Sequence, residues 1–125
     1  MKSNNVITIK SSLNAKFFKY WFDFLKPIHK LTNREIDVLA AFVKHRYELS
    51  KSIKDPEILD MVTMSKETKK KIREECNITA PYFQVIMEKL RKNNVIVDGK
   101  IQKKLLPKIN EDMGSSTLII HFEIQ

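Results

Sequence analysis

Residues 65–104 constrain the fold of this chain most, because signals that start and end helices follow one another at short intervals. A Lys-rich stretch after Ser65 is interrupted at Asn77, and Thr79 then stands where the amides of a second helix need an acceptor. Pro81 fits the first turn of that helix, where its missing N–H leaves no hydrogen bond unmade. The segment therefore predicts two helices joined by a break of a few residues.

The second of these helices is predicted to have one apolar and one polar face. Its apolar residues recur at intervals of three and four, which predicts a core-facing stripe of Phe83, Ile86, Met87 and Leu90. The other face carries Tyr82, Gln84, Val85, Lys89, Arg91 and Lys92. Two β-prone runs then flank Asp98-Gly99, a strong hairpin signal because both central residues of the tight turn need positive φ. We expect an amphipathic helix followed by a β-hairpin.

The order of these parts resembles a winged helix-turn-helix domain, in which two helices and a β-ribbon form one nucleic-acid-binding face. The resemblance is carried by Ile72, Ile78-Thr79, Phe83, Ile86, the run 90–96 and the Asp98-Gly99 tip. It covers about a third of the chain. Two positions often occupied by glycine in such domains hold Cys76-Asn77 and Asn93-Asn94 here, and Asn also tolerates the left-handed backbone conformation.

A chain of 125 residues is most simply one domain. We expect an α+β fold over residues 1–125, mostly helical, with a C-terminal β-hairpin wing and short terminal strands. Residues 1–30 would form an N-terminal strand and an aromatic helix extension, and residues 31–104 the winged-helix core. Residues 105–125 would form a loop and a C-terminal strand.

β-Branched runs at residues 5–10 and 117–124 predict the two terminal strands, and residues 110–116 between the ribbon and the last strand are predicted to be a loop. Residues 15–26 predict a helix that begins after Asn14 and ends at Pro27. Its apolar side chains lie nearly all round the helix, so it is either buried or exposes a patch for a partner. We favour burial, with a homo-oligomer or assembly contact as the alternative.

Another helix start is predicted at Thr32, where Glu35 completes a capping box. Asp55 before Pro56 predicts the start of a short helix. The phrase Leu31-Thr32-x-x-Glu35-x-x-Val38-Leu39 is similar to the opening of helix-turn-helix regulators of bacteria.

The formal net charge of +8 is concentrated on the motif. Residues 66–108 hold 12 basic and 5 acidic side chains, a net charge of +7. Such a field attracts polyanions and raises encounter rates. The alternative is that the lysines form solvated faces that keep a small protein soluble.

The sequence contains no cluster of residues typical of a catalytic or metal site. We therefore expect no enzyme, no cofactor and no metal site. Two glycines cannot form a Gly-rich phosphate loop, and His29, His45, His121 and Cys76 are scattered singly, which we interpret as surface or boundary positions. No apolar run approaches the roughly 20 residues of a membrane helix. The single cysteine and the absence of a signal sequence favour the cytoplasm, including a host cytoplasm if the chain is encoded by a phage.

The resemblance implies binding of double-stranded DNA. Thr79, Pro81, Tyr82, Gln84 and Val85 would face the major groove, where Gln84 could pair with adenine. Phosphates would be contacted by Lys69, Lys70, Lys89, Arg91 and Lys92, and on the wing by Lys100, Lys103 and Lys104.

The Lys-rich, Gly-poor composition is typical of AT-rich genomes. Our first hypothesis is therefore a transcription or replication factor of a phage or bacterium. The alternative is a structural or assembly protein, such as a component of a phage virion or connector, that uses the winged-helix core as a rigid block.

Overall fold

A computed structural model describes residues 8–10, 15–110, 115–116, 118–119, 121 and 123–124, and structural statements concern these residues. The helices are α1 (Ala15–Phe24), α2 (Lys26–His29), α3 (Asn33–Ser50), α4 (Pro56–Thr63), α5 (Lys66–Glu75) and α6 (Ala80–Lys92). They are followed by β1 (Ile96–Val97), β2 (Lys100–Ile101), the short 3-10 helix η1 (Lys103–Leu105), β3 (Ile109–Asn110) and β4 (Ser115–Ser116). The predicted α+β class is confirmed as a mostly helical fold with small antiparallel sheets.

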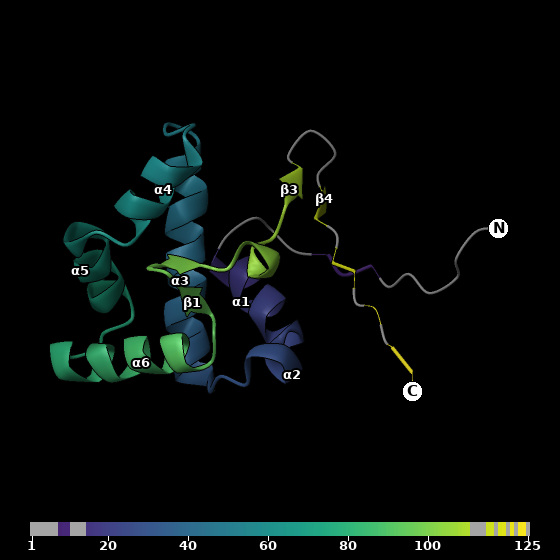
Figure 1. The fold of residues 1–125 in the computed structure, drawn as a ribbon, viewed down its shortest axis with the longest axis horizontal. Helices are drawn as coiled ribbons and strands as arrows, with labels where there is room; N and C mark the ends of the chain where they lie inside the picture. The colour runs from purple at the N-terminus through teal and green to yellow at the C-terminus, as the bar shows by residue number, and fades with distance from the viewer. Residues whose placement is uncertain are drawn as a thin grey trace.

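Helix α3 is the centre of the fold, and α1, α4, α5 and α6 all contact it (Figure 1). Its start is the predicted capping box, in which Thr32 accepts from the Glu35 amide and the Glu35 carboxylate accepts from the Thr32 amide. Its buried residues lie in the N-terminal half of the helix, between Ile36 and Val43. These side chains join one cluster of buried residues that extends from Phe18 to Leu105. The burial of apolar surface around α3 is thus what holds the helices together.

Each of the three helices that follow begins at a polar cap. The side chains of Asp55, Ser65 and Thr79 accept hydrogen bonds from first-turn amides of α4, α5 and α6. Between α5 and α6, Asn77 adopts the left-handed conformation with φ 52°, which ends one helix and redirects the chain into the next. The predicted pair of helices with a short break is confirmed.

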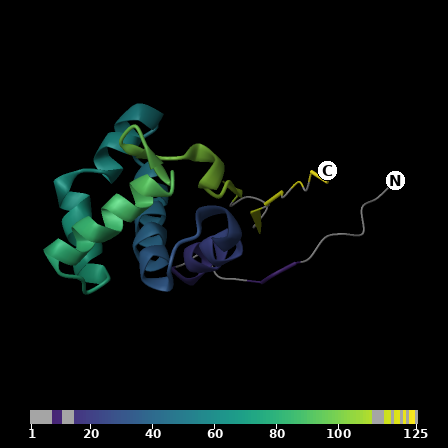
Figure 2. The same cartoon turned by 60° about the horizontal axis from the view of Figure 1, so that its bottom comes forward.

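The predicted hairpin is formed by β1 and β2, with Val97 paired to Lys100 and Ile96 paired to Ile101. Asp98 and Gly99 have φ of 55° and 75°, as the tight turn requires. Ile96 and Ile101 are buried and fix the ribbon on the core. β1 contacts α6 and β2 contacts α4, so the ribbon lies between these two helices, as Figures 1 and 2 show.

The aromatic helix α1 packs on α3 through its buried residues Phe18, Trp21, Phe22 and Leu25. The Trp21 Nε1–H donates to the carbonyl of Leu105 at 2.9 Å, which ties α1 to η1. Burial of this helix is therefore confirmed for one side, while Tyr20 and Phe24 remain about half exposed (48% and 55%).

The prediction that Pro27 ends this helix is wrong. α1 ends at Phe24, and Pro27 lies in the first turn of α2, where a residue without an N–H is tolerated. α2 ends at His29, and Lys30, which caps it, has a left-handed backbone with φ 56°.

The predicted terminal strands are not found in the parts of them that the structure describes. Residues 8–10, 118–119, 121 and 123–124 have no strand conformation, and the other residues of both strands lie outside the described residues. β-Branched residues favour a strand only against a packing surface and a partner, whereas Ile119 and Ile124 are 87% and 94% exposed.

The predicted loop at 110–116 is also corrected. Ile109–Asn110 pairs with Ser115–Ser116 in a second small antiparallel sheet, and residues 111–114 lie outside the described residues.

Candidate functional site

The outer face of α6 is the first part of the candidate site. Phe83, Ile86, Met87 and Leu90 are buried, as predicted. A helix turns by about 100° per residue, which places Pro81, Val85, Glu88 and Lys92 opposite this buried stripe. Gln84 and Arg91 flank that line on one side, and Tyr82 and Lys89 flank it on the other. The exposed positions are Pro81, Tyr82, Gln84, Val85, Glu88, Arg91 and Lys92, with Lys89 half-buried.

The composition of this face changes along α6. Its N-terminal half is uncharged, with Pro81, Tyr82, Gln84 and Val85, whereas basic side chains occupy the last turn. Cations at a helix C-terminus stabilise the helix dipole, so these charges contribute to the helix itself as well as to any ligand.

α5 separates its charges onto two edges. Lys66, Lys69, Lys70 and Arg73 recur at intervals of three and four and form a basic edge. Glu75 lies on the other edge, where its carboxylate contacts Lys44 Nζ at 3.4 Å and His45 Nε2 at 2.7 Å on α3. Because Glu75 faces α3, the basic edge lies on the far side of the buried stripe Thr68 and Ile72.

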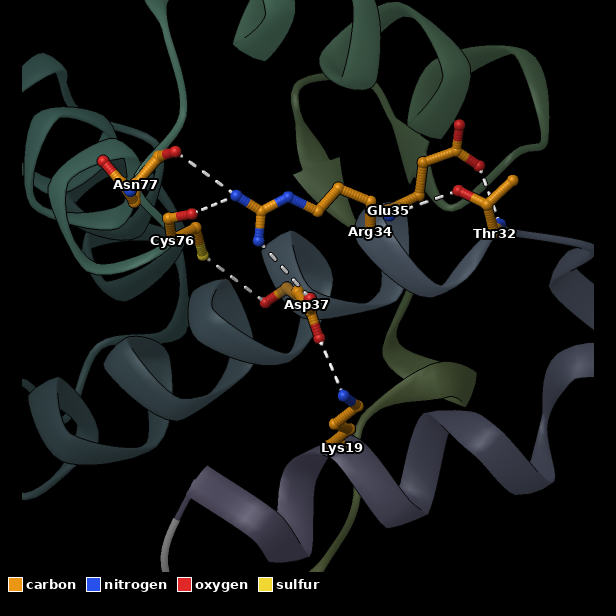
Figure 3. A network of polar contacts seen from close by, with 7 residues as sticks. All are labelled: Lys19, Thr32, Arg34, Glu35, Asp37, Cys76 and Asn77. Atoms are coloured by element: carbon orange, nitrogen blue, oxygen red, sulfur yellow. Dashed lines mark hydrogen bonds and ion pairs between the residues drawn. The ribbon is translucent and has the colours of Figure 1, made fainter.

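The turn between α5 and α6 is held by Arg34 of α3, shown in Figure 3. The Arg34 guanidinium donates to the carbonyl of Cys76 and, at 3.3 Å, to that of Asn77. The same side chain pairs with Asp37 at 3.5 Å, and Asp37 pairs with Lys19 of α1 at 3.2 Å. A positive charge at the C-terminal carbonyls of α5 is electrostatically favourable, and the contact ties the turn before α6 to α3.

The ribbon contributes Lys100, which is exposed next to the Asp98-Gly99 tip. Lys103 and Lys104 are exposed on η1, but this helix is tied to α1 through Leu105 and lies across the ribbon from α5 (Figure 1). Lys69 and Lys70 are on α5, one short turn before α6 in the chain, whereas η1 with Lys103 and Lys104 lies across the ribbon from α5 (Figure 1). The binding role of all these residues stays a prediction.

Charge pairing distinguishes the candidate site from the central helix α3. On α3, Arg34, Lys44 and Arg46 each contact a carboxylate, and Arg46 to Asp60 measures 2.9 Å. Among the described residues no acidic group lies within 4.0 Å of the basic side chains Lys69, Lys70, Lys89, Arg91, Lys92, Lys100, Lys103 and Lys104. No described carboxylate neutralises these charges by direct contact, and unneutralised positive charge attracts a polyanion.

Cys76 lies at the turn with its Sγ 3.9 Å from the Asp37 carbonyl. Burial raises the pKa of this thiol, and the negative charges of Asp37 and Glu75 act in the same direction against Arg34 and Lys44. The thiol is therefore protonated at neutral pH, which disfavours a nucleophilic role.

His29 corrects another prediction, because it is 2% exposed rather than a surface or boundary residue. Its Nδ1 accepts from the Leu31 amide at 3.0 Å, which leaves Nε2–H to donate to the Phe22 carbonyl at 2.7 Å. The His29 carbonyl in turn accepts from Asn93 Nδ2 at 2.8 Å, just after α6. Both ring nitrogens are thus satisfied in the neutral form. Burial lowers the pKa of His29, with a further contribution from Lys26.

Four residues of the site escaped the sequence prediction: Arg34, Glu88, and Lys66 and Arg73 on the basic edge of α5. Glu88 could have been found by placing α6 on a helical wheel, since it lies on the central line of the outer face. Arg34 could not, because its contact joins residues 42 positions apart.

Comparisons of the chain with protein-family models, with curated proteins and with solved structures found no match. None of the described helices is both long and apolar enough to cross a membrane.

Proposed function

We propose that this chain binds double-stranded DNA through a winged helix-turn-helix formed by α5, α6 and the β1–β2 ribbon. In this role it would act as a transcription or replication factor of a phage or bacterium. The observation that carries it is the set of basic side chains on α5, α6 and the ribbon that have no acidic partner among the described residues. In the sequence they precede and follow the exposed, uncharged N-terminal half of α6.

In this proposal the N-terminal half of α6 enters the major groove, as the second helix of a helix-turn-helix does. Gln84 is the direct reader, because its amide can bond the N6 and N7 atoms of adenine together. Tyr82 and Val85 supply apolar contact, for which the thymine methyl is a partner.

Phosphates are the partners of the surrounding cations. Lys69 and Lys70 reach one strand from α5, and Lys89, Arg91 and Lys92 reach the backbone where the last turn of α6 leaves the groove. Lys100 extends this contact on the ribbon. Lys103 and Lys104 are on η1, which lies across the ribbon from α5 (Figure 1), and would meet only flanking phosphates.

The test is a fluorescence-anisotropy titration of a random duplex at several salt concentrations. Wild-type affinity is expected to fall steeply with salt, because each neutralised phosphate releases counterions. Lys89→Glu with Arg91→Glu is expected to abolish binding without unfolding the domain.

Lys10→Glu with Lys54→Glu is the matched control, since it makes the same change in net charge at exposed positions outside α5, α6 and the ribbon. A wild-type affinity that does not depend on salt, or an equal loss in the control, contradicts the proposal.

The second candidate function is that of a structural or assembly protein. It is favoured by the exposed apolar side chains of Tyr20, Phe24 and Ile28 on α1 and α2. Light scattering separates the two functions: a stable high-order oligomer without DNA affinity supports assembly, and a monomer or dimer that binds DNA supports the first proposal.

A further inference from the structure

Glu88 is the one acidic side chain on the otherwise neutral and basic outer face of α6. It is exposed, and no basic group lies within 4.0 Å of its carboxylate among the described residues. It follows Gln84 by four positions and precedes Lys92 by four, so all three lie on neighbouring turns of one face.

This position matters if α6 lies in a DNA groove. Gln84 and Glu88 are separated by about 6 Å along the helix axis, at about 1.5 Å per residue. Base pairs are stacked about 3.4 Å apart, so the two side chains would face base pairs one or two steps from each other. A carboxylate there is repelled by phosphates on both walls of the groove, and only a hydrogen-bond donor on a base edge offsets the loss of its hydration.

We propose that Glu88 is a specificity-determining residue, which accepts a hydrogen bond from the N4 amino group of a cytosine in the major groove. Glutamate is an acceptor only, and the cytosine amino group is the donor that matches it. This inference rests on the proposed function and deepens it, because it assigns a base to a position near the adenine read by Gln84.

The same carboxylate would weaken binding to other DNA sequences. Where the base opposite Glu88 presents an acceptor, the carboxylate is left desolvated and unpaired, which lowers the affinity for non-cognate DNA. Glu88 would therefore lower the affinity for DNA in general and raise the selectivity among DNA sequences. The basic side chains around it would raise the affinity for any sequence.

A role in helix stability alone is the competing explanation. A Glu four residues before a Lys stabilises a helix slightly when the two side chains pair. Glu88 and Lys92 are not within 4.0 Å of each other. A stability role would also leave base preference unchanged on substitution.

The experiment is selection of bound duplexes from a randomised pool by wild type, Glu88→Gln and Glu67→Gln, followed by affinity measurements on the selected and random duplexes. Glu67 is the matched control, an exposed acid on α5 outside the basic edge. Wild type and Glu67→Gln are expected to enrich the same sequence with a cytosine at one position. Glu88→Gln is expected to change that position to adenine, because an amide both donates and accepts.

We further expect Glu88→Gln to bind the random duplex about tenfold more tightly, equivalent to about 1.4 kcal/mol. The slope of log affinity against log salt is expected to stay the same, since no phosphate contact changes. An unchanged base preference in Glu88→Gln overturns the inference while the proposed function stands. If wild type binds no duplex at all, the proposed function fails and the inference fails with it.

Discussion

The guanidinium of Arg34 donates a hydrogen bond to the main-chain carbonyl of Cys76, 42 positions further along the chain. One side chain of the central helix α3 thereby holds the turn between α5 and α6. Asp37 and Lys19 extend this contact to α1 (Figure 3). The turn that precedes α6 is therefore linked by polar contacts to both α3 and α1.

Replacement of Arg34 is expected to loosen this turn. Arg34→Lys keeps the charge but cannot reach the Cys76 and Asn77 carbonyls and Asp37 at once, because an ammonium lacks the planar fork of the guanidinium. We expect the free energy of unfolding to fall by about 1 kcal/mol.

Urea unfolding of Arg34→Lys and of Arg73→Lys measures this effect. Arg73 is half-buried on α5 and makes no ion pair with the described residues, so it is the matched control. An equal loss of stability in both variants would show that the contact to the turn is not the cause.

The conformation of Asn77 leads to a second prediction. Its φ of 52° is unfavourable for a residue with a Cβ, by about 1 kcal/mol, and asparagine tolerates it better than alanine does. Asn77→Ala is expected to lower the melting temperature by about 4 °C. Asn77→Gly is expected to stay close to wild type, because glycine adopts positive φ freely. Calorimetry of the three proteins checks this, and a melting temperature for Asn77→Ala above that of Asn77→Gly contradicts it.

Burial of His29 predicts a dependence of stability on pH. The pKa of His29 is lowered in the folded protein, by burial first, while the unfolded chain takes up a proton near the ordinary pKa of about 6.5. The unfolded state then binds more protons at acidic pH, so stability is full above about 6.5 and falls as the pH is lowered toward the folded pKa. Protonation of Nδ1 would also break its hydrogen bond with the Leu31 amide.

Urea unfolding at pH 7.5 and 5.5 tests this prediction by comparing wild type with His29→Gln. We expect wild type to lose more stability than the variant between the two pH values. Every other residue is the same in both proteins, so the comparison isolates the contribution of His29. Equal losses in the two proteins would mean that His29 is not the group responsible.

Local signals in the sequence were enough to predict much of the central fold. Thr32 with Glu35 and Thr79 with Pro81 act within one helical turn, and Asp98-Gly99 acts within one hairpin, so their effect does not depend on distant residues. The exposed and buried faces of α6 follow from its periodicity for the same reason.

What the sequence did not predict depends on contacts between distant segments. Burial of His29 requires the Phe22 carbonyl and the Leu31 amide to converge on its ring, and nothing in a single histidine signals this. The β-branched ends of the chain have strand propensity, but the described residues of these segments have no partner strand. In the candidate site, the spacing of residues along the sequence predicted neither the contact of Arg34 with the turn nor the separation of η1 from α5.

Trp21 provides a prediction for the contact between α1 and η1. Trp21→Phe removes the hydrogen bond from Nε1 to the Leu105 carbonyl and leaves that acceptor without its partner. We expect the free energy of unfolding to fall by about 1 to 2 kcal/mol. Tyr20→Phe, an aromatic change at an exposed position of the same helix, is expected to have little effect in the same chemical-denaturation measurement. Loss of stability in Tyr20→Phe but not in Trp21→Phe would contradict the assignment.

Lys103 and Lys104 allow a test of how far the proposed DNA-binding face extends. Each lysine that neutralises a phosphate adds about one unit to the slope of log affinity against log salt. Lys69→Gln with Lys70→Gln is expected to lower that slope by about two, because both residues lie on α5 directly before α6. Lys103→Gln with Lys104→Gln removes the same charge from η1, which is tied to α1, and is expected to change the slope by less than one unit. Anisotropy titrations on one duplex measure both variants. A larger decrease for the η1 pair would place the DNA over α1 and η1 instead, with the last turn of α6 at the edge of the contact.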